Sequence, residues 1–260
     1  MDPFENLDLR GDTTFALALE ACNREYNVSH FTPNDLFYRN GTIYAFTRGL
    51  KVFLRDGIEK FVYQKKKVEE LSKYDCILMR QDPPFDLAYI TATHLLEKLS
   101  KKTVIINNPF EVRNAPEKIF VTNFNDLMPK TIITRNLQSI IEFRDHYKNI
   151  IIKPLYGNGG DGVFHVNPND NNFNSILEVF LKNYKEQFIV QEYIPDIVKG
   201  DKRIILIDGE IAGAINRIPA KGESRSNLHV GGKPKKTKLN ENDIEICNKI
   251  SPFLKSKGLF

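Results

Sequence analysis

The chain has 260 residues, of which 41% are hydrophobic and 27% are charged, a balance typical of a globular protein with one large or two modest domains. Its 37 basic and 33 acidic residues leave a net charge of +4, which argues against a nucleic-acid-binding protein and favours small anionic ligands. The three cysteines lie far apart without CxxC pairs, which argues against a disulfide framework or a zinc site. No apolar stretch resembles a signal peptide or reaches membrane-spanning length, so we expect a cytoplasmic protein without a membrane partner.

The first elements that the pattern predicts form a β-α-β unit. Residues 74–79 indicate a buried strand, and residues 103–107 indicate a second one. Between them we predict a helix from about Asp86 to Ser100, because Pro83 and Pro84 cannot extend a helix backwards and Asp86 can accept the free amide hydrogens of its first turn. Alternating strands and helices of this kind are typical of an α/β protein.

A second pattern begins after Asn108-Pro109, where we place a domain boundary. The expected elements are a helix at about 116–123, a strand near Thr131, a helix at 137–147, strands at 150–153 and 163–166, a helix at about 172–184 and a strand at 188–191. Asp208-Gly209 between apolar runs predicts a hairpin. Residues 219–238 predict a mobile loop, and Asn240 is expected to cap a last helix.

A glycine-rich segment follows the strand that ends in Lys153. Four glycines within six residues, at 157, 159, 160 and 162, let the backbone fold closely around an anion with its amide hydrogens turned inward. The lysine adds a compact positive charge beside them. The lysine precedes the glycines, so this is not a Walker loop, and from these residues alone an ordinary hairpin stays an equal alternative.

Polar residues gather again about thirty residues further on. Gln191 and Glu192 end a predicted strand and offer amide and backbone groups that could read the edge of a base. Asp201 could accept hydrogen bonds from ribose hydroxyls, and Arg203 could reach a phosphate. The alternative is that residues 201–203 form a solvated charge cluster.

The order of these features resembles the ATP-grasp fold, in which ATP lies between two antiparallel sheets. Further segments along the chain resemble prokaryotic glutathione synthetases, and the most specific is Arg80-Gln81-Asp82-Pro83-Pro84-Phe85-Asp86. The other matching segments are Met1-Asp2-Pro3, Asp12-Thr13-Thr14-Phe15, Glu117-Lys118, Gly200-Asp201-Lys202-Arg203, Arg217-Ile218-Pro219 and Gly222-Glu223-Ser224-Arg225-Ser226-Asn227. The resemblance runs from end to end of the chain.

This resemblance implies an α/β protein in which a pre-ATP-grasp, Rossmann-like parallel-sheet domain at 1–113 precedes an ATP-grasp domain at 114–260 with a lid subdomain at about 120–195. It also implies an ATP-dependent ligase that joins γ-glutamylcysteine to glycine through an acyl phosphate and gives glutathione, ADP and phosphate. The family further implies a homo-oligomer, a homotetramer. The alternatives are an inactive ATP-binding protein and an ATP-grasp ligase for another carboxylate.

The resemblance also implies roles for individual residues. The residues expected to bind ATP are Lys118, Lys153, Gly157, Asn158, Gly159, Gly160, Gly162, Gln191, Glu192, Ile194 and Asp201. Arg203, Arg217 and Arg225 are the expected catalytic arginines, because a planar guanidinium binds phosphate and carboxylate groups well. Arg80, Thr13, Thr14 and Asn227 are expected to bind the peptide substrate. Alone, Lys118 would more often be a solvated helix lysine, and Thr13 or Thr14 could simply cap the first helix.

Two departures from the family pattern accompany the resemblance. Family members begin with a strand before Met-Asp-Pro and continue past Gly-Leu-Phe into a Glu-x-Asn segment that holds magnesium, so we expect an ATP-grasp domain incomplete at its C-terminus and ligands for Mg²⁺ (or Mn²⁺) beyond Phe260. Asp161 adds a negative charge to the glycine loop, which would weaken phosphate binding unless it points outward.

Overall fold

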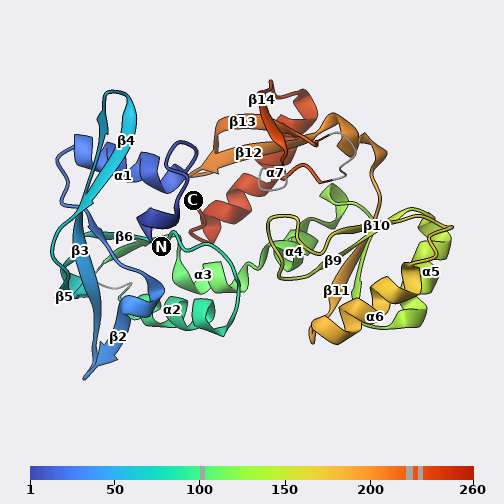
Figure 1. The fold of residues 1–260 in the computed structure, drawn as a ribbon, viewed down its shortest axis with the longest axis horizontal. Helices are drawn as coiled ribbons and strands as arrows, with labels where there is room; N and C mark the ends of the chain where they lie inside the picture. The colour runs from blue at the N-terminus through green and yellow to red at the C-terminus, as the bar shows by residue number, and fades with distance from the viewer. Residues whose placement is uncertain (100–102, 221–224, 228–230) are drawn as a thin grey trace. The chain divides into compact units, whose positions relative to one another are not determined.

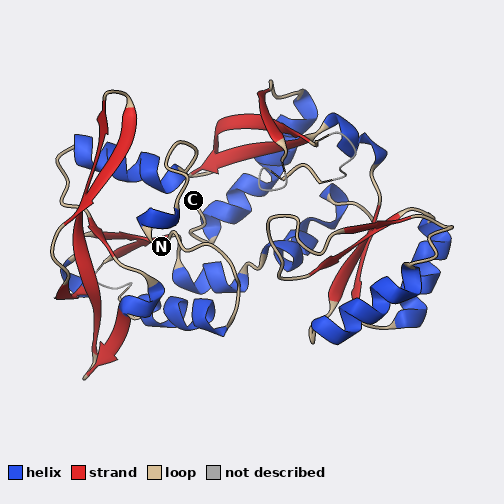
Figure 2. Ribbon diagram, viewed as in Figure 1, coloured by secondary structure: helices blue, strands red, loops and turns tan. Residues whose placement is uncertain are grey.

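The structure is a computed structural model that describes residues 1–99, 103–220, 225–227 and 231–260. Its contacts divide the chain into two compact units, Met1–Arg113 with Leu259 and Asn114–Gly258 with Phe260. Each unit contains both helices and sheets (Figure 2). The expected α/β class is therefore confirmed.

The described part of the first unit contains a five-stranded antiparallel sheet, organised around the long strand β3 (Figure 1). Its elements are α1 (Thr13–Asn23), β1 (Ser29–His30), β2 (Leu36–Arg39), β3 (Thr42–Arg55), β4 (Ile58–Tyr63) and β5 (Lys67–Glu70). The alternative role of Thr13 or Thr14 as the cap of α1 is not found, because the Asp12 carboxylate accepts hydrogen bonds from the backbone of Thr14 at 2.6 Å and Phe15 at 3.0 Å. A carboxylate is a strong N-cap, so neither threonine is needed for that role.

The expected β-α-β unit is confirmed as a parallel pair of strands with a helix between them. Strands β6 (Cys76–Leu78) and β7 (Val104–Ile106) pair in parallel, and α2 (Leu87–Glu97) connects them. Asp86 caps α2 by accepting from the Tyr89 backbone at 2.9 Å, as expected. The predicted helix end at Ser100 lies outside the described residues. One buried cluster of this unit joins β3, β6, β7 and α2, and a second joins α1 to the other half of β3.

The second unit begins with short helices and a four-stranded antiparallel sheet in the order β10-β9-β11-β8. Its elements are α3 (Pro109–Asn114, shared with the first unit), α4 (Glu117–Phe120), β8 (Thr131–Thr134), α5 (Leu137–Tyr147), β9 (Ile150–Pro154), β10 (Phe164–Val166), α6 (Phe173–Asn183) and β11 (Phe188–Glu192). Helices α5 and α6 cover one face of the sheet (Figure 1). Side chains from both helices and three strands form a core there, in which Ile152, Val166 and Phe188 are fully buried.

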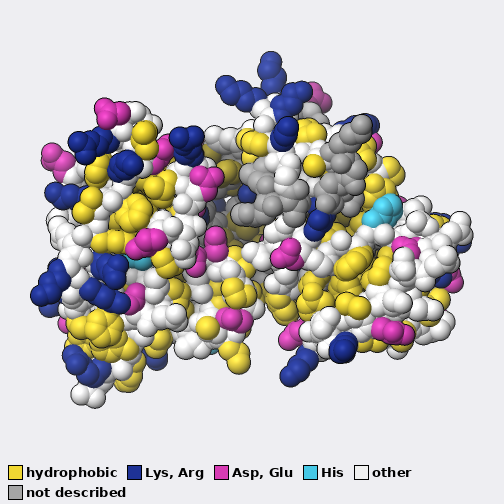
Figure 3. Space-filling view, viewed as in Figure 1, with side chains coloured by type: hydrophobic (Ala, Val, Ile, Leu, Met, Phe, Trp, Pro, Cys, Tyr) yellow, Lys and Arg dark blue, Asp and Glu magenta, His cyan; other side chains and the backbone are white. Residues whose placement is uncertain are grey.

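The second unit ends with a three-stranded antiparallel sheet and a long helix. Its elements are β12 (Asp201–Ile207), β13 (Glu210–Ile218), β14 (Lys233–Lys236) and α7 (Glu241–Ser256). The expected hairpin is confirmed, with positive φ angles at Asp208 and Gly209, and Asn240 caps α7 by accepting from the Asp243 backbone at 2.8 Å. The sequence prediction of a loop throughout 219–238 is wrong at β14, because lysines and a proline are characteristic of edge strands and hide the strand signal. Exposed Lys and Arg side chains gather over this strand (Figure 3).

Candidate nucleotide-binding site

Lys153 and Gln191 lie on the same face of the β8–β11 sheet. Ile150 and Ile152 belong to the core under α5 and α6, so strand alternation turns Lys153 to the opposite face. In the register of β9 and β11, Lys153 pairs with Ile189 and Gln191 pairs with Ile151. Lys153 and Gln191 are therefore diagonal neighbours on the face turned away from the helices.

Lys118 approaches the same region from α4. Its ammonium group donates hydrogen bonds to the Gly157 carbonyl oxygen and, at 2.8 Å, to the Glu117 carboxylate. Burial, and to a smaller extent the charge of Lys118, lower the pKa of Lys153. Two neighbouring ammonium groups repel each other, and an anion such as a phosphate would relieve this repulsion.

The glycine loop connects β9 to β10. Gly159, Gly160 and Gly162 have φ angles of +65°, +92° and +67°, which favour glycine. A Cβ atom on Gly160 would lie 2.9 Å from Asn227 Oδ1 and 3.3 Å from Arg225 Cδ. Arg225 also donates a hydrogen bond to the Gly160 carbonyl oxygen at 3.1 Å. The segment 225–227 therefore packs directly on the glycine loop, at a distance that a side chain on Gly160 would disturb.

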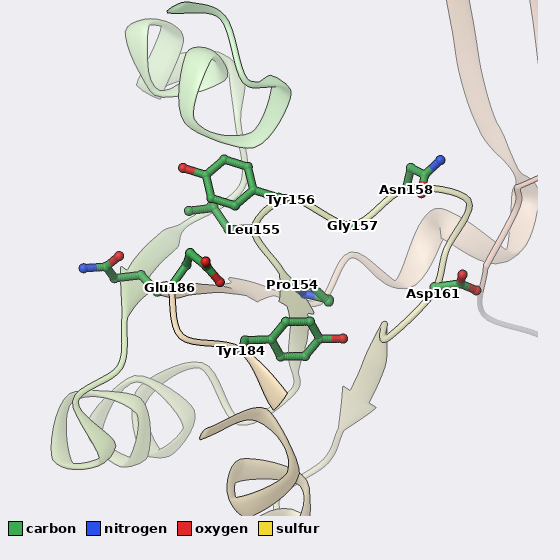
Figure 4. A pocket seen from close by; sticks show the side chains of 9 residues that line it. Pro154, Leu155, Tyr156, Gly157, Asn158, Asp161, Tyr184 and Glu186 are labelled. Carbon is green, nitrogen blue, oxygen red and sulfur yellow. The ribbon is translucent and has the colours of Figure 1, made fainter. Parts of the chain in front are cut away.

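A cavity of about 220 Å³ lies beside this loop. Figure 4 shows Tyr184 beside Pro154, with Asn158 and Asp161 on the loop itself. A Cβ atom on Gly162 would lie 2.8 Å from Pro154 Cγ and 3.1 Å from the Tyr184 hydroxyl. These two rings therefore support the loop from one side, and Lys118 and Lys153 are not among the residues that line this cavity.

The end of β11 holds the residues expected to border adenine. Gln191 is buried and its amide donates to Thr131 Oγ1 at 2.8 Å, whereas Glu192 is exposed and its backbone amide donates to the Lys130 carbonyl at 2.9 Å. Ile194 begins the next turn (η5, Pro195–Lys199) and is 50% exposed. The sequence reasoning missed His165, whose ring stacks on Tyr193 with centroids 3.9 Å apart. Strand β9 lies between β10 and β11 and so brings the two rings together, which no local sequence signal indicates.

Two residues expected at different parts of the site are paired with each other on β12 and β13. Arg217 Nε donates to Asp201 Oδ1 at 2.7 Å, and Arg217 Nη2 donates to Asp201 Oδ2. Arg203 is exposed and lies two residues further along β12, on the same face as Asp201. The intervening Lys202 forms an ion pair with Asp243 of α7, so Asp201, Arg203 and Arg217 share the face turned away from α7.

The expected substrate residues Arg80 and Thr14 meet in the first unit. Arg80 Nε donates to Thr14 Oγ1 at 3.3 Å, and both line a cavity of about 800 Å³. Thr13 is not among its lining residues. The Asp2 carboxylate accepts from the Asp82 backbone at 2.9 Å and so fixes the segment that carries Arg80. Asn227 lies in the second unit on Gly160, and the remaining expected motif residues 222–224 lie outside the described residues, as do 221 and 228–230 of the expected loop.

Within the described ranges, no three His, Cys, Asp or Glu side chains come together in a way that could hold a metal ion. The described residues likewise contain no helix with the length and apolar character required to cross a membrane.

Comparison with known proteins gives the fold and the family. The first domain of prokaryotic glutathione synthetase matches residues 1–113, and its ATP-grasp domain matches residues 117–260. Glutathione synthetase of Agrobacterium fabrum is 50% identical over 99% of this chain and 81% of its own length, and that of Vibrio vulnificus is 40% identical over 100% and 82%.

Among solved structures, the ATP-grasp ligase PsnB in complex with precursor peptide PsnA2 and AMPPNP aligns with a TM-score of 0.56 at 14% identity, over 98% of this chain and 83% of its own. D-cycloserine synthetase DcsG aligns with a TM-score of 0.55 at 14% identity, over 72% and 68%. These likenesses show the ATP-grasp fold. Because both family domains match in order and together span nearly the whole sequence, this chain belongs to the prokaryotic glutathione synthetase family.

Proposed function

We propose that this chain ligates γ-glutamylcysteine to glycine with ATP, and that the second unit binds the nucleotide. The observation that carries the proposal is the pair of Lys118 and Lys153 beside the glycine loop, since two close ammonium groups suit a polyphosphate. Family membership supports the choice of ligase chemistry.

The nucleotide is assigned to one continuous region of the second unit. The two lysines would bind the phosphates, and the amides of Gly157, Asn158, Gly159, Gly160 and Gly162 would cover the β- and γ-phosphates. The purine would lie on the face of the β8–β11 sheet that carries Gln191, bordered by Glu192 and Ile194. Asp201 would accept hydrogen bonds from the ribose.

The proposed reaction needs positioning and charge neutralisation rather than a side-chain nucleophile. The cysteinyl carboxylate of the peptide attacks the γ-phosphorus, ADP leaves, and the resulting acyl phosphate is attacked by the amine of glycine with release of phosphate. Arg203, which is exposed beside Asp201, would neutralise the charge on the transferring phosphoryl group. Arg217 would hold a substrate carboxylate through its planar fork.

The segment around Arg225 and Asn227 would close over the glycine loop. Arg225 donates to the Gly160 carbonyl and Asn227 packs against the same glycine, so movement of the loop and of this segment would be linked. We propose that the region at about 120–195 acts as the lid, and that closure keeps water from the acyl phosphate. Arg80 and Thr14, with Thr13 nearby, are proposed to bind the peptide.

The family implies a divalent metal with ATP, and Mg²⁺ or Mn²⁺ would neutralise phosphate charge when bound. The described residues do not form a carboxylate set that fits such an ion. A thiol substrate and consumption of ATP suit a reducing compartment, which supports the cytoplasm. Family resemblance is the basis for proposing a homotetramer, which light scattering on a sizing column would test.

The direct test is ADP release with ATP, Mg²⁺, γ-glutamylcysteine and glycine. We expect release that requires both substrates, together with formation of glutathione detected by mass spectrometry. ATP binding without any turnover would instead identify an inactive nucleotide-binding protein. Faster turnover with another amine or carboxylate would identify a ligase of different specificity.

A further inference from the structure

The Asp201 carboxylate is positioned to serve two parts of the proposed site at once. Both of its oxygens accept hydrogen bonds from Arg217, one at 2.7 Å, in a fork-to-fork arrangement. The Arg217 side chain is only 14% exposed, whereas the Asp201 side chain is 35% exposed. The arginine is therefore held in place, while its partner still faces solvent.

The local backbone fixes this pair. Gly200 precedes Asp201 with a φ angle of +106°, and a Cβ atom there would lie 2.8 Å from the Arg217 carbonyl oxygen and 2.7 Å from Asn216 Oδ1. Asn216 Nδ2 also donates to the Lys199 carbonyl at 3.0 Å. Only a glycine permits this close approach, which brings Asp201 directly opposite Arg217 in the register of β12 and β13.

A carboxylate offers about four lone-pair positions, of which Arg217 uses two. The positions that remain are suited to the vicinal hydroxyl groups of a ribose. Asp201 can therefore accept from a nucleotide sugar without releasing the guanidinium, and a hydroxyl bound there would further restrain the carboxylate that orients Arg217.

We propose that Asp201 is a positioning residue that couples the two ligands: it orients Arg217 for the substrate carboxylate and binds the ribose through the same carboxylate. This inference rests on the proposed function and extends it, because occupation of the ribose site strengthens the carboxylate site. Coupling of binding is reciprocal, so the carboxylate substrate also strengthens nucleotide binding.

The test compares the affinities of ATP and 2′,3′-dideoxy-ATP, measured by calorimetry in the absence of turnover. In the unmodified protein we expect ATP to bind about tenfold more tightly than 2′,3′-dideoxy-ATP. One or two hydrogen bonds from the ribose to a charged acceptor account for a difference of this size. Arg217→Met should reduce that ratio at least threefold, because the carboxylate loses the partner that orients it. Asp201→Asn should reduce it further and raise the KM for γ-glutamylcysteine more than it lowers kcat.

Lys202→Met is the matched control, since it removes an ion pair of the same strand on the opposite face. It should leave the ATP preference unchanged. An equal ATP preference in the unmodified protein and in Arg217→Met would overturn the inference, as would tight ATP binding without any preference for the ribose hydroxyls. Failure to bind either nucleotide would instead defeat the proposed function itself.

Discussion

The two sheets of the second unit hold the residues proposed to bind ligands by different means. The β8–β11 sheet is packed by α5 and α6 over a core in which Ile150, Phe180 and Phe188 are at most 1% exposed. The β12–β14 sheet has no fully buried hydrophobic side chain among its described residues, and Ile205 and Ile207 are 48% and 62% exposed. Two ion pairs instead hold side chains of its first strand, Asp201 with Arg217 on one face and Lys202 with Asp243 on the other.

This contrast separates stability from ligand binding. Packing makes the first sheet a rigid base for Lys153, so substitutions in its core should unfold it. Ion pairs near the surface contribute little to stability but orient side chains well. Substitutions in the second sheet should therefore change ligand affinity with small effects on folding.

The largest expected effect comes from removing a ring from the core of the first sheet. Phe180→Ala should lower the free energy of unfolding by roughly 3–5 kcal/mol, because it deletes a buried side chain and leaves a cavity. Ile205→Ala in β12 should cost less than about 1 kcal/mol, since that side chain is half exposed. Urea denaturation measures both. Equal costs at the two positions would contradict the contrast between the sheets.

Lys153→Met tests the face of the β8–β11 sheet that is turned away from α5 and α6, where the nucleotide is proposed to bind. The substitution should reduce ATP-dependent turnover roughly 10²–10³-fold, because it removes a fixed positive charge from the phosphate site. The melting temperature should stay the same or rise, since a half-buried cation is replaced by an apolar chain of similar length. The control is Lys182→Met on the exposed side of α6. A Lys153→Met protein that melts well below the control would assign the lysine to the fold rather than to the site.

Gly160→Ala and Gly159→Ala test whether contact between the glycine loop and segment 225–227 matters for turnover. Both glycines have positive φ angles, but a Cβ atom would meet Asn227 and Arg225 at Gly160 and nothing within 4 Å at Gly159. Both variants should carry about 1 kcal/mol of backbone strain, and only Gly160→Ala should also lower turnover, by about tenfold. Steady-state kinetics decides the matter: a similar loss in both variants would mean that strain alone, and not contact with segment 225–227, limits the loop.

The pH dependence of ATP binding is the smallest expected effect. The pKa of Lys153 lies below its usual value of 10.5, first because of burial and then because of Lys118. Lys153 therefore loses its charge, and its attraction for phosphate, at a lower pH than an ordinary lysine. In the window between its lowered pKa and 10.5 the unfolded chain binds more protons, so the contribution of this group to stability rises with pH.

Calorimetric titrations with ATP from neutral to alkaline pH would measure this effect. Affinity should begin to fall before the range in which exposed lysines titrate. Lys153→Arg should flatten the profile because its guanidinium stays charged. Identical profiles for the two proteins would show that another group controls the alkaline loss.

Local signals explain how much of the fold could be predicted. The helix caps at Asp86 and Asn240 and the Asp208-Gly209 hairpin depend on chemistry within a few residues, and all three are present. The strands between residues 29 and 70 were not predicted, although the turns Asn40-Gly41 and Asp56-Gly57, which join β3 to β2 and β4, are hairpin signals of the same kind as Asp208-Gly209. The pairing of β3 with β1 and β5, in contrast, joins segments that are distant in the sequence. Strand β14 was not predicted because its lysines and proline are not typical of strands. The same residues discourage another strand from pairing with this edge.

The candidate site shows the same difference between local signals and contacts that join separate strands. A lysine after a strand followed by glycines could be noticed in the sequence, but only the family resemblance favoured a phosphate site over an ordinary hairpin. The pairing of Asp201 with Arg217 and the stacking of His165 on Tyr193 could not, because each joins residues from different strands. Such contacts depend on register, which a single sequence does not encode locally.

The composition of β14 has a consequence for the neighbouring sheet. All four of its residues are exposed, and three of them are lysines. A strand from another molecule that approached this edge would find a proline without an amide hydrogen and a row of ammonium groups that repel a second copy of themselves. Growth of the sheet stops at this edge, so the backbone of β14 is protected from pairing with a strand of another molecule.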